Sequence, residues 1–394
     1  MVSIFIGILG ILLVLGLGFL LSNDKKNINF RAIIVMIVLQ ILITLFMFKT
    51  TIGLKVVESV SNLVATILNF GYDGIDFVLG GLIPEGTTVF FMNVLMLIIF
   101  TSTLLSILTH IKVLPFAIKY IGGTLAKITG LSKVVTFNSI NSIFFGQSES
   151  ILAIKAHLDK MNDNKLFIIS TSAMASVSAG IMGSYMTMIP SNYVLVAMIL
   201  NALSSLIVAT IIAPIKPEED EEINIKEISS TKSVFEAISN GALDGGKVAL
   251  IVAAMLVAYI ALMSLLNAVF DGVFGMDLTT MLGYVFAPVA WIMGIPASEI
   301  VTAGSIMGTK LATNEFVAML QLQPMIPDLT EKTVAIVSTF LVSFANFSSI
   351  GIISGSIQAV NGEKARVVAN FGLKMLLAST LASVLSATMV GLFS

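Results

Sequence analysis

The sequence lacks cysteine entirely and has few charged residues. The absence of cysteine excludes disulfides, thiolate metal sites and cysteine nucleophiles. Only 11% of the 394 residues are charged, against about 25% in soluble domains, and 57% are hydrophobic. A formal net charge of -2 leaves no basic surface for a nucleic acid. This composition excludes a soluble globular protein and predicts an all-α polytopic membrane protein.

Long apolar runs predict the membrane-spanning helices. A helix needs roughly 20 apolar residues to cross the hydrocarbon core of a bilayer. Eight runs of about this length predict transmembrane helices at residues 4–22, 32–48, 88–109, 165–189, 192–213, 241–270, 333–360 and 367–392. The first run has no charged residues before it and no small-residue cleavage site after it, so we expect a transmembrane helix there and not a signal peptide.

Three other segments are expected to be interfacial helices. Along residues 52–70 the apolar side chains fall on one helical face and the polar ones on the other, which predicts a helix lying along the membrane surface. Residues 112–127 and 275–292 have a similar character, and Trp291 in the second of these could anchor it at the interface.

Residues 134–161 and 297–323 are apolar but are interrupted near the middle by polar residues. Each arm has about a dozen residues, which is enough to reach about half way through a core of about 30 Å. We therefore expect two re-entrant helical hairpins, whose tips must be buried in protein or line a wet cavity. An ordinary helix with a polar kink is the alternative for each segment.

The distribution of lysine and arginine favours one orientation. With the N-terminus placed outside, all of the 21 Lys and Arg except Lys49, Lys55, Lys310 and Lys332 fall in connections on one side. The positive-inside rule makes that side cytoplasmic, so both termini are expected outside. The first hairpin then enters from the cytoplasm and the second from the external side.

Each hairpin is followed by two spans, and the two units have opposite orientations. Inverted repeats with interrupted helices are typical of secondary transporters, which hold their binding site near the membrane midplane. An acidic stretch at residues 214–240 precedes the span at 241–270, between the two units. We expect it to be a solvated cytoplasmic linker.

Two carboxylates within the hairpins are candidate functional groups. Glu149 ends a Gly-Gln-Ser-Glu sequence at the first break, and Glu315 lies in Thr-Asn-Glu-Phe at the second. Because a charge at the bilayer centre costs about 2.5–3.5 kcal/mol, such groups require a function. Each carboxylate could instead only cap the N-terminus of a half-helix, although capping and ligand binding are compatible.

The spans after the hairpins carry polar breaks of their own. Residues 175–180 contain two serines, and residues 344–351 contain Asn346, Ser348 and Ser349. Together the four breaks offer carboxylate, amide and hydroxyl groups, which suit a neutral ligand rich in hydroxyls and heterocyclic edges. Lys310 is the only cation nearby in the sequence, which argues against a phosphate-bearing ligand.

Three motifs resemble the concentrative nucleoside transporter family. They are the Gly-Gln-Ser-Glu sequence that ends at Glu149, Thr-Asn-Glu-Phe-Val-Ala from Thr313, and Phe-Ala-Asn-Phe-Ser-Ser-Ile from Phe344. The resemblance covers essentially the whole chain. It implies a homotrimeric nucleoside importer of a bacterial plasma membrane, working by alternating access of a mobile transport domain against a scaffold. The scaffold would comprise residues 1–111 and 241–273, and the transport domain residues 112–213 and 274–394.

The resemblance also implies the roles of eight binding residues. Gln147, Ser148 and Glu149 would contact the nucleobase, with Ile181 as an apolar wall. Three further side chains would hold the ribose hydroxyls and one would line the pocket; they are Glu315, Asn346 and Ser349, and Phe344. The base is left open between a pyrimidine nucleoside such as uridine, which is weakly favoured, and a purine nucleoside.

The driving ion is expected to be the proton. Sodium-coupled members have an asparagine five residues before the glutamine of the first hairpin, where this sequence has Ser142, and Ser176 would be a companion position. Losing the amide oxygen removes a hard ligand for sodium, so the sequence resembles the proton-coupled branch, with Glu149 and Glu315 as candidate proton carriers. Sodium coupling with Ser142 and Ser176 as ligands is the alternative.

A membrane-embedded hydrolase is a remote alternative from another class of protein. It would use a serine nucleophile and a glutamate base, but the sequence places no histidine near a membrane-embedded serine and no metal-ligand cluster. No enzymatic activity, no cofactor and no metal other than a coupling sodium ion are therefore expected.

Overall fold

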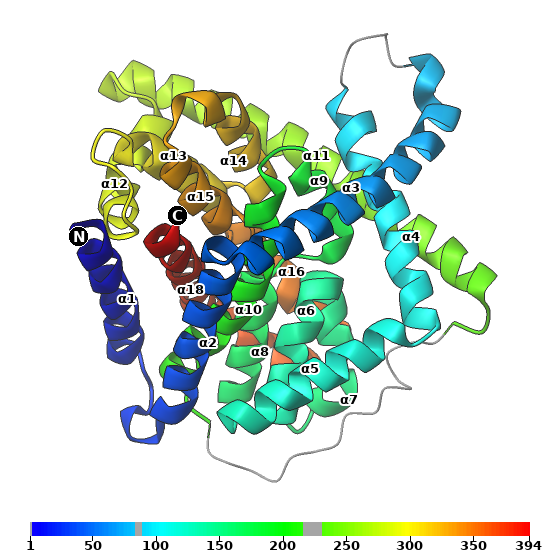
Figure 1. The fold of residues 1–394 in the computed structure, drawn as a ribbon, viewed down its shortest axis with the longest axis horizontal. Helices are drawn as coiled ribbons and strands as arrows, with labels where there is room; N and C mark the ends of the chain where they lie inside the picture. Colours follow the sequence, from blue (N-terminus) through cyan, green and yellow to red (C-terminus); the bar gives the residue numbers. More distant parts are fainter. Residues whose placement is uncertain (1, 83–88, 216–230) are drawn as a thin grey trace.

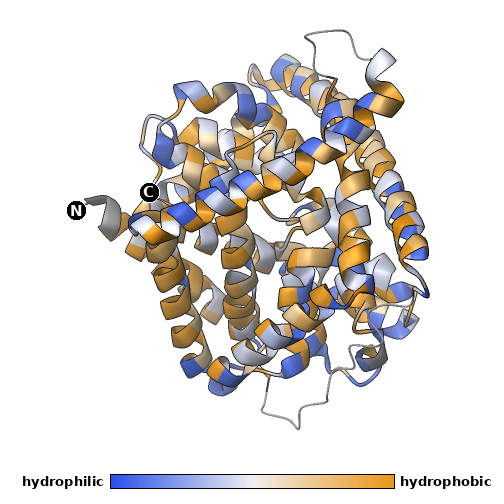
Figure 2. Cartoon of the chain, turned by 45° about the vertical axis from the view of Figure 1, so that its right-hand side comes forward, coloured by the Kyte–Doolittle hydropathy of each residue, from blue (hydrophilic) through white to orange (hydrophobic). Residues whose placement is uncertain are grey.

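A computed structural model describes residues 2–82, 89–215 and 231–394, and this part of the chain is helical without a β-strand. The helices form one body in which the two chain ends lie close together (Figures 1 and 2). Gly7 of α1 (Val2–Leu20) packs directly against Leu392 of α18 (Gly372–Phe393). The all-α prediction is therefore confirmed.

The first part of the chain forms helices that lie around the central units (Figure 1). After α1 come α2 (Phe30–Lys49), α3 (Thr51–Leu79), a π-helical turn (Phe91–Leu95), α4 (Leu97–His110) and α5 (Val113–Thr129). The longest helix, α11 (Val234–Phe274), packs along α4. It begins seven residues before the expected span at 241–270.

Two units of broken helices fill the centre. The first has α6 (Lys133–Leu152), α7 (Lys155–Leu158), α8 (Asp163–Ala175), α9 (Ala179–Met186) and α10 (Ser191–Ile212). The second follows α12 (Leu278–Ile292) and has α13 (Ile300–Ala312), α14 (Glu315–Leu322), α15 (Glu331–Leu341), α16 (Phe347–Gln358), α17 (Gly362–Asn370) and α18. The interrupted hairpins and the interrupted spans that follow them are confirmed.

The number of spans differs from the sequence expectation. Among the described residues, seven helical segments are long and apolar enough to cross a membrane, against the eight expected. α15 and α16 do not count because the break between them leaves arms of 11 and 12 residues. The first expected span, at 4–22, does not count either, because Phe5–Leu20 is one of the shorter apolar helices. α3 does count, since residues 51–79 form one continuous helix of 29 residues, nine residues longer at its C-terminal end than the interfacial helix expected at 52–70.

The inner and outer helices differ in what surrounds them. Nearly all residues of α10 and most of α8 and α18 are buried, whereas α3 and α11 expose most of theirs. The exposed side chains of the outer helices are largely apolar, and Figure 2 shows long hydrophobic stretches on them. Exposed apolar helices of this length match a hydrocarbon environment.

Close contact between α4 and α11 depends on two glycines. A Cβ atom on Gly241 would lie 2.6 Å from the Cα of Thr103, and one on Gly245 would lie 2.7 Å from the backbone oxygen of Ile98. Such distances leave no room for a side chain, so these positions let the two backbones approach closely. The pair of helices forms one wall of the cavity described below.

The acidic linker expected at residues 214–240 falls largely outside the described residues, which stop at 215 and resume at 231. Residues 234–240 of that range form the first part of α11.

Candidate functional site

The first hairpin turns at Gly146, which interrupts α6. Its backbone has φ 78° and ψ -170°, a conformation that essentially only glycine adopts. A Cβ atom there would also lie 3.0 Å from the Cβ of Ser178, at the break between α8 and α9. The glycine thus allows the tip of the hairpin to lie against the neighbouring broken helix.

The two broken spans touch one another at their breaks. α8 ends at Ala175 and α9 begins at Ala179, while α15 ends at Leu341 and α16 begins at Phe347. The backbone N–H of Phe344 donates a hydrogen bond of 3.0 Å to the backbone oxygen of Ser176. This bond joins the two units at the centre of the protein and satisfies backbone groups that the breaks release from helical pairing.

Three half-helices begin at this point, each with a capping side chain. Ser178 accepts from the N–H of Gly180 at 3.1 Å, Asn314 from Val317 at 3.0 Å, and Asn346 from Ser349 at 3.1 Å, the last through its side-chain oxygen. These are the residue types that cap helices best. The side-chain cap of α14 is Asn314, and Glu315 is the first residue of this helix, so its carboxylate lies at the helix N-terminus without being the cap.

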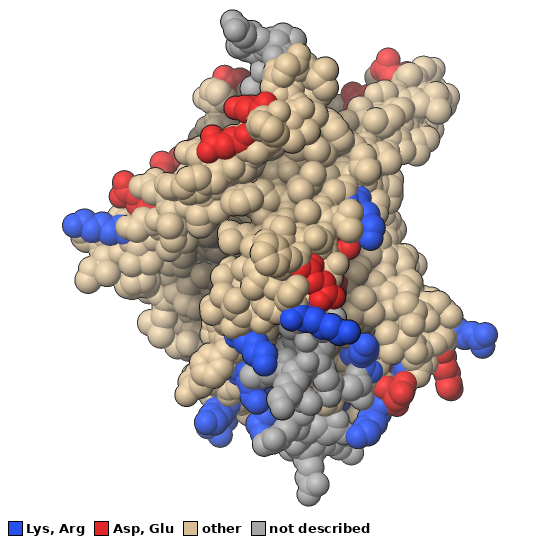
Figure 3. All heavy atoms as spheres, turned by 90° about the vertical axis from the view of Figure 1, so that its right-hand side faces the viewer, with Lys and Arg blue, Asp and Glu red and all other residues tan. Residues whose placement is uncertain are grey.

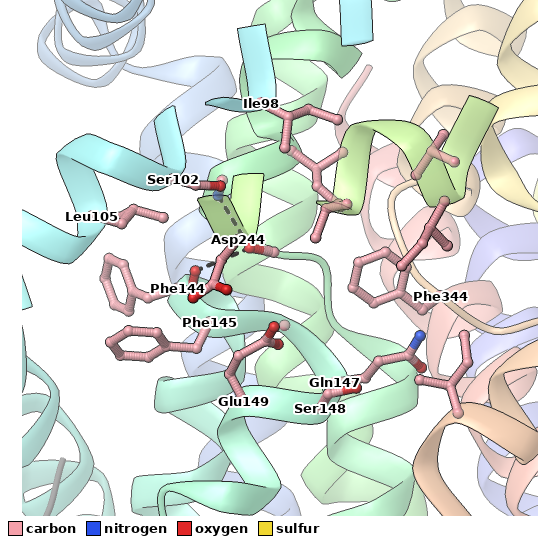
Figure 4. Close-up of a pocket in the computed structure, with 18 of the residues that line it drawn as sticks. Ile98, Ser102, Leu105, Phe144, Phe145, Gln147, Ser148, Glu149, Asp244 and Phe344 are labelled. Atoms are coloured by element: carbon pink, nitrogen blue, oxygen red, sulfur yellow. Dashed lines mark hydrogen bonds between the residues drawn. The ribbon is translucent and has the colours of Figure 1, made fainter. Parts of the chain in front are cut away.

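A cavity of about 650 Å³ opens between the breaks and the α4–α11 wall. All eight side chains expected to bind a ligand line it, namely Gln147, Ser148, Glu149, Ile181, Glu315, Phe344, Asn346 and Ser349. Figure 4 shows Gln147, Glu149 and Phe344 on one side of this space and Asp244 of α11 across from them. The structure thus brings together residues that are up to 202 positions apart in the chain.

Glu315 is held by two donors. The hydroxyl of Tyr185 donates to Oε1 at 2.8 Å, and the amide of Asn346 donates to Oε2 at 3.3 Å. Both Glu315 and Tyr185 are buried, and the Tyr185 ring packs edge-on against Phe316 with centroids 5.0 Å apart. Hydroxyls of Ser348 and Ser349 donate to the oxygen of Asn346 at 2.7 and 3.2 Å. This network fixes one carboxylate with acceptor capacity left for ligand hydroxyls.

The first hairpin offers polar groups that are less occupied. The side-chain oxygen of Gln147 is buried and accepts no hydrogen bond within the described part of the chain. Glu149 projects into the cavity and remains accessible, and the charge of Asp244 acts on it from the opposite wall. An orphaned buried acceptor of this kind normally has a partner in the working protein, which here would be a ligand or water.

Ser142 and Ser176, the candidate ion-coupling serines, lie outside the residues that line the cavity. Both are buried, and each hydroxyl donates to a backbone oxygen three residues earlier, Ser142 to Ser139 and Ser176 to Ala173, both at 2.9 Å. Their oxygens keep acceptor capacity, but the hydroxyl protons are used within their own helices.

Sequence reasoning missed five residues at the site. Tyr185 was not identified because it lies within a predicted span. The signal that could have identified it is its spacing, since it comes four residues after Ile181 and therefore lies on the same helical face. Asn240 and Asp244 were missed because the fold alone brings α11 to the cavity. Ser102 and Ser106 of α4 line the same wall.

Comparisons with known proteins agree with this geometry. Three family models match: the C-terminus of the Na+ dependent nucleoside transporters over residues 193–391, their N-terminus over residues 9–82, and a nucleoside recognition "Gate" model over residues 91–192. Together with a cavity that is lined by polar and apolar side chains and set among broken helices, these matches define the class of protein as a membrane transporter of nucleosides. Such a protein is not an enzyme, so the alternative of a membrane-embedded hydrolase is wrong.

Individual relatives place the chain within that class. It is 37% identical to the purine nucleoside transport protein NupG of Bacillus subtilis, with 98% of both chains covered, and 33% identical to the nucleoside permease NupC of Helicobacter pylori, with 98% and 97% covered. The chain belongs to the concentrative nucleoside transporter family.

Solved structures agree in fold. The transporter CNTnw in an inward-facing substrate-bound state matches with a TM-score of 0.93 and 31% identity over 99% of this chain and 98% of that one. A doubly substituted CNTnw in an outward-facing state matches with a TM-score of 0.95 and 30% identity over 100% and 98%.

Proposed function

We propose that the protein is a secondary active importer of nucleosides driven by protons. The observation that carries the proposal is the single cavity in which both hairpin tips, both helix breaks and all eight expected binding residues meet. The ribose would bind at the Glu315, Asn346 and Ser349 side of the cavity, where a carboxylate and an amide are already aligned. The nucleobase would bind at Gln147, Ser148 and Glu149. There the side-chain oxygen of Gln147 accepts no hydrogen bond from the described residues and could accept one from the base.

We propose that nucleosides of both base classes, pyrimidine and purine, are carried. The sequence weakly favours a pyrimidine nucleoside such as uridine, whereas the NupG relative is named for purine nucleosides. The cavity volume of about 650 Å³ is within the range of small-molecule sites and imposes no size limit that separates the two.

We propose the proton as the driving ion because the residue at position 142 is a serine. A serine there supplies a hydroxyl whose proton already serves its own helix, and it supplies no amide oxygen. Glu149 and Glu315 are the groups that could exchange a proton at the cavity, with Glu149 the first candidate because it is accessible there. Sodium is the second candidate for the driving ion, favoured by the description of the matching family models as Na+ dependent.

The transport cycle is proposed to use two domains in a homotrimer. Residues 112–213 and 274–394 would move as the transport domain against a scaffold of residues 1–111 and 241–273. The α4–α11 wall of the cavity would then belong to the scaffold, and alternating access would carry the broken helices past it.

The proposed setting is the plasma membrane of a bacterium with both termini outside. On the face drawn in Figure 3, most Lys and Arg gather at one end of the molecule, and the other end carries mainly Asp and Glu. This asymmetry supports the orientation in which the basic end faces the cytoplasm.

Uptake into proteoliposomes tests the function and the ion together. Labelled uridine and inosine would be offered under an imposed pH gradient in choline buffer, and separately under an imposed sodium gradient at constant pH. We expect accumulation above equilibrium with the pH gradient alone and its loss with a protonophore. Accumulation only with sodium would replace the proton by sodium, and no accumulation of either nucleoside under either gradient would refute the function.

A further inference from the structure

Lys310 has no role in the function described so far, although its position is unusual. Among the described residues it is the one lysine or arginine that is buried, with a relative exposure of 0%. It lies in the last turn of α13, in the first arm of the second hairpin. A buried charge generally stabilises a fold no better than an apolar side chain of the same volume, so stability alone does not account for a lysine here.

The ammonium group of Lys310 binds the end of the broken helix α15. Its Nζ donates to the backbone oxygen of Phe340 and to the hydroxyl of Ser343, both at 2.6 Å, and it lies 4.3 Å from the centroid of the Phe340 ring. Phe340 is in the final turn of α15, where backbone carbonyls lack helical partners and carry partial negative charge. A cation is the group best suited to this position.

The segment next to this contact leads directly into the nucleoside site. The segment 342–345 lies between α15 and α16 and is not part of either helix. Side chains of other helices form hydrogen bonds with it. Asn201 of α10 donates to the backbone oxygen of Val342 at 2.5 Å, and Ser383 of α18 lies 2.8 Å from the Ser343 hydroxyl. Phe344 and Asn346, which line the cavity, come directly afterwards.

Lys310 also acts on the carboxylate of the same hairpin. Glu315 lies five residues further along, beyond the break, and the two charges interact electrostatically. The described residues that face Glu315 from other helices, Tyr185 and Asn346, are uncharged hydrogen-bond donors. Lys310 is the charged side chain of the described residues that acts electrostatically on Glu315 from within the protein, without an ion pair between them.

We propose that Lys310 is a positioning residue for the ribose half of the site. Through its contacts with Phe340 and Ser343, its ammonium fixes the segment between α15 and α16, so that Asn346 and the Glu315 that it holds present a fixed pair of groups to the ribose hydroxyls. This inference rests on the proposed nucleoside transport, but it concerns residues that do not touch the ligand.

The test compares Lys310→Met, Lys310→Arg and the control Lys119→Met. Methionine keeps an unbranched side chain without the charge, arginine keeps the charge, and Lys119 is an exposed lysine of α5 away from the cavity. The dissociation constants of uridine and 3'-deoxyuridine would be measured by calorimetry on purified protein, beside the thermal unfolding midpoint.

We expect Lys310→Met to weaken uridine binding at least tenfold and to bind 3'-deoxyuridine nearly as well as uridine. Lys310→Arg should recover part of the preference for uridine, and Lys119→Met should match the parent. A structural role alone would lower the unfolding midpoint and leave the preference between the two ligands intact in the folded protein. That result, or parental affinity in Lys310→Met, would overturn the proposal.

A second variant keeps the test decisive if Lys310→Met does not fold. Ser343→Ala removes one acceptor of the ammonium while leaving Lys310 in place, and it should weaken uridine binding with the same loss of preference. Parental affinity and preference in Ser343→Ala would count against the role of Lys310. Failure of the proposed function gives a different result, because the parent protein itself would then bind neither nucleoside.

Discussion

The hydroxyl of Tyr185 donates a hydrogen bond of 2.8 Å to Oε1 of Glu315, joining the first unit of broken helices to the second. Tyr185 lies on α9 and Glu315 begins α14, so the bond spans 130 residues of sequence. It orients the carboxylate from one side while Asn346 orients it from the other. The two units of broken helices therefore line one shared cavity.

Tyr185→Phe should weaken nucleoside binding without unfolding the protein. The ring contact with Phe316 is kept, and only the hydroxyl that orients Glu315 is lost. Hydrogen bonds to charged groups contribute about 1.5–3 kcal/mol, so we expect at least a tenfold rise in the dissociation constant of uridine. Tyr120→Phe, on the exposed face of α5, is the control and should leave the constant unchanged.

Glu315→Gln should damage sugar recognition more than base recognition. The change replaces a charged acceptor for ribose hydroxyls by a neutral amide, at a cost of about 1.5–3 kcal/mol in binding. The parent should reject 3'-deoxyuridine, and the variant should bind it almost as well as uridine. If the variant binds uridine with parental affinity and still rejects the deoxy ligand, the ribose does not bind at Glu315.

Asn346→Ala can be compared with Asn361→Ala, because both asparagines cap a helix. Asn346 caps α16 within the cavity, and Asn361 caps α17 outside it, accepting from Lys364 at 2.9 Å. Each change should cost about 1 kcal/mol of stability through the lost cap. Only Asn346→Ala should also abolish measurable uptake at low nucleoside concentration. Equal transport in the two variants, at equal membrane abundance, would show that the cavity is not the site.

Gly146→Ala should impair transport because the hairpin tip cannot accept a side chain. The backbone conformation costs a non-glycine residue about 1–3 kcal/mol, and the added Cβ would press on Ser178. We expect a lower maximal rate of uptake together with a lower thermal midpoint. Gly123→Ala is the matched control, since it has open space and an ordinary helical backbone, and it should be neutral or slightly stabilising.

Ser142→Asn tests which ion drives uptake. In the parent we expect uridine uptake in choline buffer to rise as the external pH falls and to collapse with a protonophore. The asparagine would supply the amide oxygen that sodium lacks at this position, so sodium stimulation should appear in the variant alone. Strict sodium dependence of the parent would contradict the proton proposal whatever the variant does.

The sequence was sufficient for the broken architecture and for most of the site because polar residues inside apolar runs are costly. Glu149, Glu315 and Asn346 stood out for that reason, and all three line the cavity. Tyr185 did not stand out, because a tyrosine is unremarkable in an apolar helix until its hydroxyl has a known partner. Asp244 depends on how α11 packs against α4, which no local pattern encodes.

The ends and lengths of helices were less predictable for a physical reason. An amphipathic pattern is the same for a helix on the membrane surface and for one that packs against protein. The pattern in residues 51–79 therefore did not indicate that α3 continues beyond residue 70. The start of α11 at Val234 likewise depends on a serine cap, since Ser233 accepts from the N–H of Glu236 at 3.1 Å.

The length of α11 has a consequence for the surrounding lipid. At 1.5 Å per residue its 41 residues extend for about 60 Å, roughly twice the thickness of a bilayer core. Such a helix must tilt strongly or project well beyond the hydrocarbon, and its tilt then varies with the thickness of the membrane. Because α11 forms one wall of the cavity, a change in its tilt would move that wall, and the length of the lipid acyl chains would then act on the cavity.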